Sequence, residues 1–302
     1  MKFSTAAITL AGAAAAVPMA TEKRADAIND AVILQYALTL EHLEDTFYRE
    51  GLAKYSEGDF AAAGFDATAY ANVKRISKDE TEHVNFLTSG LKAAGAKPVA
   101  ACTYDFGYKD VKTFLATASI LEGVGVSAYL GAAADIMSKK YLTAAGSILT
   151  VEARHSSFIR GGLKEVPFPQ PFDTPLTINE VYSLASGFIK SCPKDNAALP
   201  VKAFPMLAAA PADGKSAVKA GSTIKLTTPG NTVTAKNGGK VYAAFIAVTG
   251  PTNVEAKPVD GGFEVQVPEG FAGQTYVVLT SCKDTVNDDS TAAGPAIVEI
   301  SE

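Results

Sequence analysis

The chain has 302 residues, 47% of them hydrophobic and 20% charged, which suits a folded protein long enough for two domains. Its formal net charge of -5 gives no basic surface for nucleic acid, and no lysine or arginine cluster points to a lipid surface. We therefore expect neither nucleic acid nor a membrane as a partner.

Residues 1–24 are typical of a targeting segment. Lys2 precedes an alanine-rich apolar run over 3–17, and the sequence PMA at 18–20 is a small-residue cleavage context. A dibasic pair at 23–24 follows, as at sites cut by processing proteases. We expect a signal peptide with a dibasic propeptide and a protein secreted to the extracellular space or cell wall; the alternative is a buried N-terminal helix.

Four long segments have apolar residues at helical spacing. They cover residues 25–50, 67–94, 111–136 and 141–163. We expect a loop over 51–66, a short step at 137–140, and a longer connection over 95–109. A long central crossover between two helical hairpins is the connectivity of ferritin-like bundles.

After residue 163 the pattern changes. Prolines break any helix up to residue 175, and Thr177 with Glu180 predicts a capping box for a short helix that ends near Cys192. The bundle with this extra helix would cover 25–195, a linker 196–214, and a small β-sandwich 215–302. The expected strands cover residues 222–227, 241–248, 263–267, 275–280 and 296–300. The fold class is thus mainly α plus β, a ferritin-like four-helix bundle followed by a β-sandwich.

The chain has three cysteines, Cys102, Cys192 and Cys282. An odd number leaves one unpaired or paired between chains. Since Cys102 and Cys192 flank the second half of the bundle, we favour a disulfide between them.

Two of the three histidines follow a glutamate by three residues. These pairs are Glu80 with His83 and Glu152 with His155. Residues three apart share a face of a helix, so the carboxylate and the imidazole of each pair point to the same place. One such pair is usually a solvated helix face, but its repetition on two helices favours a metal site.

The other two long helices each carry a glutamate with a tyrosine seven residues on. Glu41 precedes Tyr48, and Glu122 precedes Tyr129. These faces are otherwise apolar, and a buried carboxylate is costly unless it is paired or bound to metal. Converging carboxylates would also repel one another without cations.

The di-metal carboxylate pattern takes one glutamate from each of two helices and a Glu-x-x-His pair from each of the other two. The expected ligands are Glu41, Glu80, His83, Glu122, Glu152 and His155. The glutamates of the two Glu-x-x-His pairs would bridge two metal ions. Glu41 and His83 would be terminal ligands of one metal ion. Glu122 and His155 would be terminal ligands of the other. This donor set suits iron first and manganese next, and zinc is also compatible.

Tyr48 and Tyr129 are the expected catalytic residues, as groups that hydrogen-bond the carboxylates or serve redox steps. His42 points about 100° away from Glu41 around the helix, so we expect a structural role for it.

Several neighbouring residues leave alternatives open. Glu44 and Glu82 are further carboxylates, but neither keeps the spacing to a tyrosine or histidine, so we expect both at the surface. Gly123 and Gly125, beside Glu122, are poor helix formers. They could open space for a small ligand near the metals or allow close helix packing.

The segments LEHLEDTFY at 40–48, DETEH at 79–83 and VEARH at 151–155 resemble the secreted ferritin-like proteins of fungi. That group includes stress-response and late-sexual-development proteins and is related to plant desiccation-related proteins. The resemblance covers the bundle and, more loosely, residues 267–280 of the tail. It implies a ferritin-like fold with a di-metal centre and no particular substrate, because a fold does not dictate function.

The leading hypothesis is a secreted di-iron or di-manganese protein that reacts with dioxygen or hydrogen peroxide in stress or development, as an oxidase or a catalase-like oxidoreductase. The alternative is a non-catalytic stress or developmental protein of the cell surface. Its metal site would be structural or vestigial, and its β-module would bind a cell-wall component. Iron storage is a third hypothesis, which the signal peptide and the appended tail disfavour.

Overall fold

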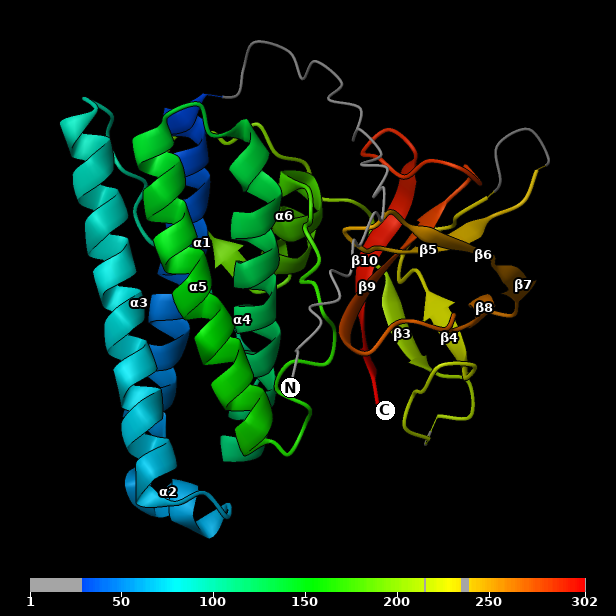
Figure 1. The fold of residues 1–302 in the computed structure, drawn as a ribbon, viewed down its shortest axis with the longest axis horizontal. Helices are drawn as coiled ribbons and strands as arrows, with labels where there is room; N and C mark the ends of the chain where they lie inside the picture. The colour runs from blue at the N-terminus through cyan, green and yellow to red at the C-terminus, as the bar shows by residue number, and fades with distance from the viewer. Residues whose placement is uncertain (1–28, 215, 235–238, 302) are drawn as a thin grey trace, which may run out of the picture.

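The computed structural model describes residues 29–214, 216–234 and 239–301 (Figure 1). A helical part formed by residues up to Ser186 lies beside a part made of strands, formed by the C-terminal residues. The predicted signal peptide and dibasic pair lie outside the described residues.

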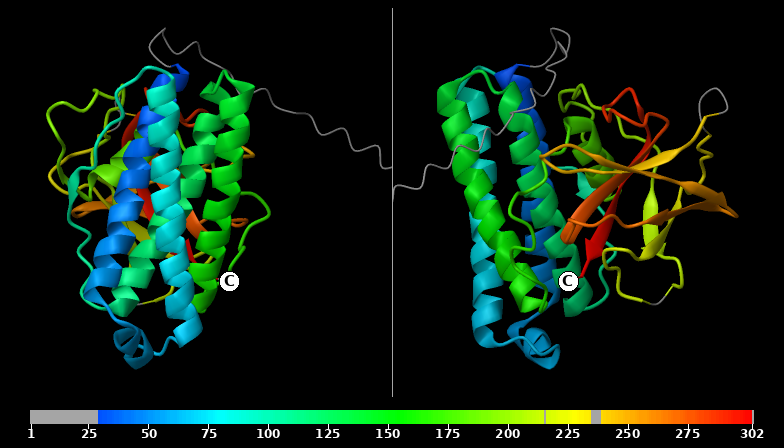
Figure 2. Two further views of the ribbon diagram at one scale, coloured as in Figure 1. Left: turned by 90° about the vertical axis from the view of Figure 1, so that its left-hand side faces the viewer. Right: turned by 45° about the vertical axis from the view of Figure 1, so that its right-hand side comes forward.

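The bundle consists of four long helices, as expected. They are α1 (Asp30–Lys54), α3 (Ala67–Ala93), α4 (Val111–Ala132) and α5 (Lys139–Gly162), and each begins after a side-chain cap. Helix α1 packs mainly along α3, and α4 along α5, so residues 94–110 form the long crossover between two hairpins. The left view of Figure 2 shows the bundle in front of the strands.

Helix α4 lies at the centre of the molecule. With the 3-10 turn η1 (Ala133–Asp135), it is long and apolar enough by composition to cross a membrane. Most of it is buried inside the protein, where it contacts α1, α5 and α6 (Ile178–Ser186). A helix that is apolar on most sides is typical of such a core position.

Three short elements connect the bundle. Helix α2 (Glu57–Ala62) occupies the segment expected as a loop, because Ser56 caps it. Helix α6 begins at the predicted Thr177 capping box. It ends before Cys192, because residues Ile189–Ser191 form β2, which pairs with β1 (Thr103–Tyr104).

The cysteines pair as we favoured. A disulfide joins Cys102 to Cys192, beside the β1–β2 pair, and Cys282 is free. The disulfide therefore ties the segment after α6 to the crossover between the two hairpins.

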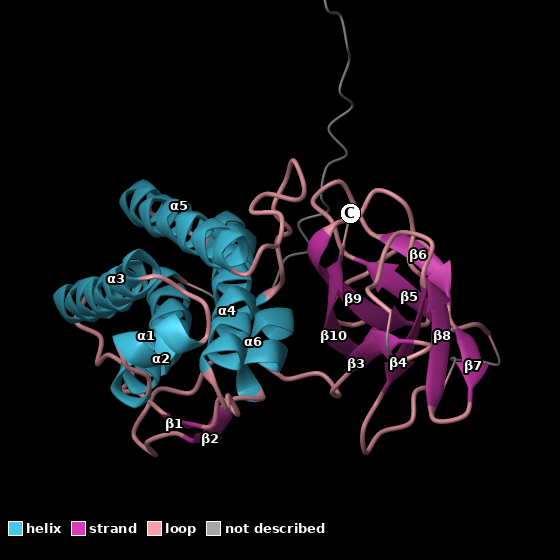
Figure 3. Cartoon of the chain, turned by 90° about the horizontal axis from the view of Figure 1, so that it is seen from below, coloured by secondary structure: helices cyan, strands magenta, loops and turns pink. Residues whose placement is uncertain are grey.

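The C-terminal part consists of two antiparallel four-stranded sheets (Figure 3). The strands are β3 (Ala208–Pro211), β4 (Thr223–Thr227), β5 (Tyr242–Phe245), β6 (Thr252–Glu255), β7 (Lys257–Val259), β8 (Gly262–Gln266), β9 (Gly273–Thr280) and β10 (Thr291–Ile300). Their orders are β10-β9-β5-β6 and β3-β4-β8-β7. All five expected strands are present, but β3 lies in the expected linker, where it pairs with β4.

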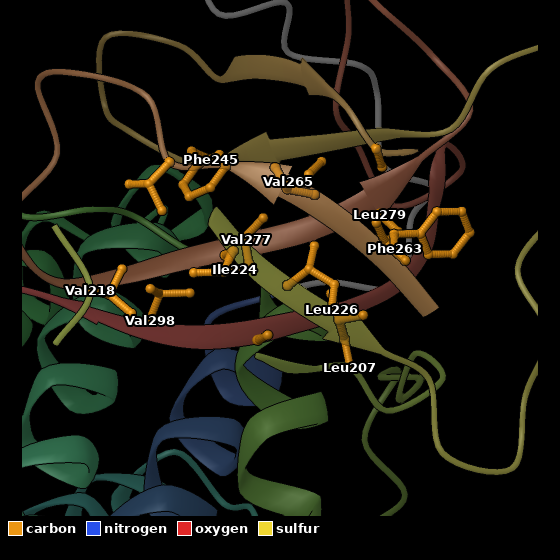
Figure 4. Packing of buried hydrophobic residues seen from close by; sticks show 14 of the residues in the cluster. Leu207, Val218, Ile224, Leu226, Phe245, Phe263, Val265, Val277, Leu279 and Val298 are labelled. Carbon is orange, nitrogen blue, oxygen red and sulfur yellow. The ribbon is translucent and has the colours of Figure 1, made fainter. Parts of the chain in front are cut away.

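The two sheets enclose a hydrophobic core (Figure 4). Side chains two apart on a strand share a face, and Ile224 with Leu226 on β4 are both fully buried. Val277 and Leu279 on β9 are likewise two residues apart and fully buried in this core.

The sheet that contains β9 packs directly against α4. The hydroxyl of Tyr276 donates a hydrogen bond of 2.9 Å to the backbone oxygen of Gly123. A Cβ atom at position 123 would lie 2.6 Å from the side chain of Gln274. Of the two alternatives for Gly123, close packing is therefore the one found, here between a helix and a strand.

Candidate metal centre

Four glutamates and two histidines meet inside the bundle. The glutamates, Glu41 on α1, Glu80 on α3, Glu122 on α4 and Glu152 on α5, have no exposed surface. His83 and His155 are 9% and 6% exposed. We call these six residues the carboxylate–histidine centre.

His83 lies against three carboxylates of the centre. Its Nδ1 atom is 3.2 Å from Glu80 Oε2 and 3.2 Å from Glu152 Oε1. Glu41 Oε2 lies 3.3 Å from the same nitrogen. One nitrogen thus faces oxygens from three different helices.

His155 takes the equivalent place beside the other hairpin. Its Nδ1 atom is 3.0 Å from Glu80 Oε1 and 3.4 Å from Glu122 Oε2. Its Nε2 atom lies 3.4 Å from Asp79 Oδ2. A carboxylate behind a ligating imidazole orients the ring, and we had not expected this role for Asp79; its place next to Glu80 was the only signal in the sequence.

The donor atoms form two overlapping sets, each with its atoms within 4.8 Å of one another. The first set is Glu41, Glu80, His83 and Glu152, and the second is Glu80, Glu122, Glu152 and His155. Glu80 and Glu152 belong to both sets, which is the arrangement that bridging carboxylates require. The structure brings all six expected ligands together, and their role as ligands remains a prediction.

Several oxygens of the centre are buried without a hydrogen-bond partner in the described part of the chain. Both oxygens of Glu152 are among them, with one oxygen each of Glu41, Glu80 and Glu122. Leaving one buried polar atom unpaired costs about 1–3 kcal/mol, and more if it is charged. Inward-facing oxygens beside imidazole nitrogens are a donor set that cations satisfy, so the cluster is compatible with a metal site.

The pKa values in the centre reflect burial and crowding. Burial raises the pKa of Glu80 to about 7, although the adjacent imidazoles of His155 and His83 oppose the rise. Burial and the charge of Glu80 raise the pKa of Glu152 well above its usual range. Burial lowers the pKa of His155, but the adjacent carboxylates of Glu122 and Glu80 outweigh this effect and raise its pKa to about 11. The interior therefore favours added positive charge.

Each tyrosine bonds a glutamate of the opposite hairpin. The hydroxyl of Tyr48 on α1 donates a hydrogen bond of 2.5 Å to Glu122 Oε1 on α4. The hydroxyl of Tyr129 on α4 donates to Glu41 Oε1 on α1. Burial, followed by the adjacent carboxylate, raises the pKa of both phenols well above the usual value. The two hydroxyls stay protonated donors, and their catalytic role remains a prediction.

The expectation that Glu44 lies at the surface was wrong. Its side chain is only 4% exposed, because it follows Glu41 by three residues and so shares that face of α1. Burial, followed by the neighbouring carboxylates, raises its pKa well above the usual value. Glu82 is exposed, and His42 Nε2 lies 3.0 Å from the backbone oxygen of Val99, outside both donor sets.

Gly125 lies directly against the centre. A Cβ atom there would be 2.9 Å from Glu152 Oε2 and 3.0 Å from Glu44 Oε1. The missing side chain therefore leaves room for these two carboxyl groups beside α4.

Comparisons with known proteins agree with this architecture. The family model of the ferritin-like domain matches residues 29–165, which contain α1 to α5. Protein rds1 of the fission yeast Schizosaccharomyces pombe is 28% identical over 174 residues, which are 58% of this chain and 42% of that protein. The chain thus spans less than half the length of this curated relative. Both matches support the resemblance to fungal ferritin-like proteins.

Among solved structures, a conserved hypothetical protein from Mycobacterium tuberculosis aligns with 47% of this chain and 96% of its own, with 18% sequence identity and a TM-score of 0.38. The domain match contains every residue of the carboxylate–histidine centre. The match over residues 29–165 and the arrangement of the four long helices show that the helical part has a ferritin-like fold, and two antiparallel β-sheets follow it.

Proposed function

We propose that this protein binds two metal ions in the carboxylate–histidine centre, iron in preference to manganese, and reacts with dioxygen or hydrogen peroxide. The observation that carries the proposal is the set of buried, unpartnered carboxylate oxygens that face two imidazole nitrogens. Four carboxylates carry up to four negative charges, and two divalent cations would balance them.

Metal ions of this kind would supply the redox chemistry and would polarise a bound oxygen species. The chain's own residues position the donor atoms. Glu80 and Glu152 would bridge the ions, while Asp79 orients the ring of His155.

The two tyrosines hold the outer carboxylates. Tyr48 and Tyr129 fix one oxygen each of Glu122 and Glu41, which leaves the other oxygen to face the centre. Burial of all four glutamates excludes bulk water from the site.

Metal content and turnover test this proposal together. Wild-type protein should carry two metal ions per chain by elemental analysis and should consume dioxygen or peroxide. Glu80→Gln, His83→Ala and His155→Ala should lose both metal and turnover. Glu82→Gln is the matched control, because Glu82 is exposed on the same helix, between Glu80 and His83.

Wild-type protein that stays metal-free after reconstitution with Fe(II) and Mn(II) would contradict the proposal. So would a Glu82→Gln variant that loses metal as completely as Glu80→Gln.

Secretion is part of the same proposal. The Cys102–Cys192 disulfide supports an oxidising compartment, since such bonds persist mainly in exported proteins. N-terminal sequencing of protein recovered from the culture medium should find a start after residue 24. An intact Met1 on protein that remains inside the cell would contradict it.

A second candidate function is a non-catalytic surface protein that binds a cell-wall component. The observation in its favour is a cavity of 330 Å³ between the bundle and the sheets, bordered by Phe168 and Phe172. These side chains are 79% and 62% exposed, and exposed apolar side chains beside polar groups mark interaction sites. Three results together would favour this function. Metal-loaded protein would show no turnover, it would be retained on insoluble chitin or glucan, and the Phe168→Ser variant would not be retained.

A further inference from the structure

An apolar cavity of 210 Å³ lies beside the carboxylate–histidine centre. Leu43 of α1 and Val124 of α4 line its bundle side. Ala185 of α6 and Ile297 of β10 line its outer side. Figure 3 shows α6 between α4 and β10, where this outer wall is built.

The outer wall comes from outside the ferritin-like match. That match ends at residue 165, whereas α6 and β10 follow it in the chain. The appended part of the protein thus covers one face of the bundle and turns it into a partly enclosed cavity, which the four long helices alone would not form.

The inner end of the cavity lies next to the centre without being lined by any of its six residues. Glu44 and Gly125 both line the cavity. The Glu152 carboxylate lies directly beyond Gly125, because a Cβ atom on this glycine would be 2.9 Å from its Oε2. A molecule in the cavity would therefore be separated from a bridging carboxylate by one glycine.

Among the described residues that line the cavity, Glu44 is the only ionisable one. Its carboxyl group makes no hydrogen bond or ion pair with any of the described residues, although its side chain is 4% exposed. A buried carboxyl of this kind is stabilised when a ligand supplies a donor. The apolar walls thus favour an apolar ligand, and the Glu44 carboxyl group favours a ligand with one N–H or O–H donor.

We infer that this cavity binds a compact one- or two-ring aromatic molecule with a single N–H or O–H donor, held against the Glu44 side of the centre. An apolar cavity of about 150 Å³ is enough to stay dry and bind benzene, so the larger space here suits a ring system of about the size of indole. The inference deepens the proposed function, on which it rests, by assigning the class of molecule placed beside the metals.

Indole is a suitable probe, because the chain contains no tryptophan and the fluorescence of indole is then free of protein signal at wavelengths beyond tyrosine absorption. Full-length protein, metal-free and metal-loaded, should bind indole saturably at one site per chain. In NMR spectra of the metal-free protein, the ring protons should show contacts to the methyl groups of Val124 and Ile297.

Filling the cavity should weaken this binding. Ala185→Phe places a ring in the space and should weaken indole binding at least about tenfold, and Leu184→Phe provides a second, half-buried position if the first variant does not fold. Ala144→Phe is the matched control, because Ala144 lines a different cavity of 50 Å³ near the end of the bundle where α1 and α5 begin, and this variant should bind indole normally.

The donor preference is tested at Glu44. Glu44→Leu removes the acceptor and should weaken indole binding about threefold to tenfold while toluene, which has no donor, binds as well as before. Equal losses for both molecules would contradict the role of Glu44.

The outcomes separate this inference from the proposed function. Metal-loaded protein that turns over peroxide or dioxygen but does not bind indole, or NMR contacts elsewhere, would overturn the inference alone. Folded Ala185→Phe or Leu184→Phe protein that binds indole with wild-type affinity would also overturn it. Failure of the proposed function appears instead as absent metal uptake, whether or not indole binds.

Discussion

Two phenol groups hold the outer glutamates of the carboxylate–histidine centre in place. Tyr48 bonds Glu122 and Tyr129 bonds Glu41, so each hydrogen bond also joins one hairpin to the other. Partners of this kind keep a carboxylate in the rotamer that a metal needs.

Replacing Tyr48 by Phe should therefore lower metal affinity about 10–100-fold without lowering the stoichiometry. Competition with a chelator measures the change. Tyr55→Phe is the control, because the Tyr55 hydroxyl is buried without a hydrogen-bond partner in the described part of the chain. An equal loss of affinity in both variants would show that general packing, and not the bond to Glu122, is responsible.

A second prediction concerns Gly125, the glycine of α4 beside the carboxyl groups of Glu152 and Glu44. Gly125→Ala should reduce metal loading below two ions per chain, because the new methyl group must displace the carboxylate of Glu152 or Glu44. Elemental analysis measures the loading. In Gly146→Ala on α5, where the space around the Cβ is open, loading should stay normal and stability should rise by about 0.5–1 kcal/mol. Full loading of Gly125→Ala would contradict the geometry.

At the scale of elements, α5 is tied to the edge strand β10 by one buried arginine. Arg160 is 4% exposed and donates to both carboxylate oxygens of Glu299, at 2.8 and 3.0 Å. It also donates to the backbone oxygen of Val166 at 2.9 Å. The contact joins the ferritin-like domain to the sheets, and burial makes the loss of the partner costly.

Glu299→Ala should therefore destabilise the protein by about 1.5–3 kcal/mol, the range for hydrogen bonds to charged groups. Urea unfolding measures the change. The exposed pair of Lys240 and Glu255 in the same part of the chain provides the control, since Lys240→Ala should cost less than about 1 kcal/mol. Equal costs at the two sites would mean that Arg160 contributes no more than a surface pair does.

At the scale of the whole molecule, the protein concentrates acidic groups in the interior of its bundle. Five glutamates with 4% exposure or less come together there: Glu41, Glu44, Glu80, Glu122 and Glu152. Their repulsion opposes folding, and bound cations would offset it. Stability and metal binding should therefore be coupled in this protein.

Removing the metals should lower thermal stability. A metal ion present at about a thousand times its dissociation constant adds about 4 kcal/mol to the free energy of unfolding. Metal-free Glu152→Gln should be more stable than the metal-free wild type, because burial and the charge of Glu80 both disfavour the Glu152 carboxylate; each unit by which a pKa is raised corresponds to about 1.4 kcal/mol. Calorimetry of both proteins with and without metal measures this. A metal-free wild type more stable than metal-free Glu152→Gln would contradict the role of repulsion.

The sequence by itself determined the four long helices and the spacing of the candidate ligands along each of them. Helical periodicity and capping residues are local, so the four long helices and the Thr177 cap could be located from spacing alone. The same holds for Glu80 with His83, because three residues on one helix place two side chains on one face whatever surrounds them. Helix α2 was missed, although its Ser56 capping box was visible in the sequence.

Only the tertiary structure decided which groups meet across helices. Tyr48 bonds a glutamate 74 residues away, and the burial of Glu44 and the cavity beside it depend on how α4, α6 and β10 pack against α1. The rotation of each helix about its axis is set by the summed packing of all its neighbours, and spacing along one helix carries no information about it.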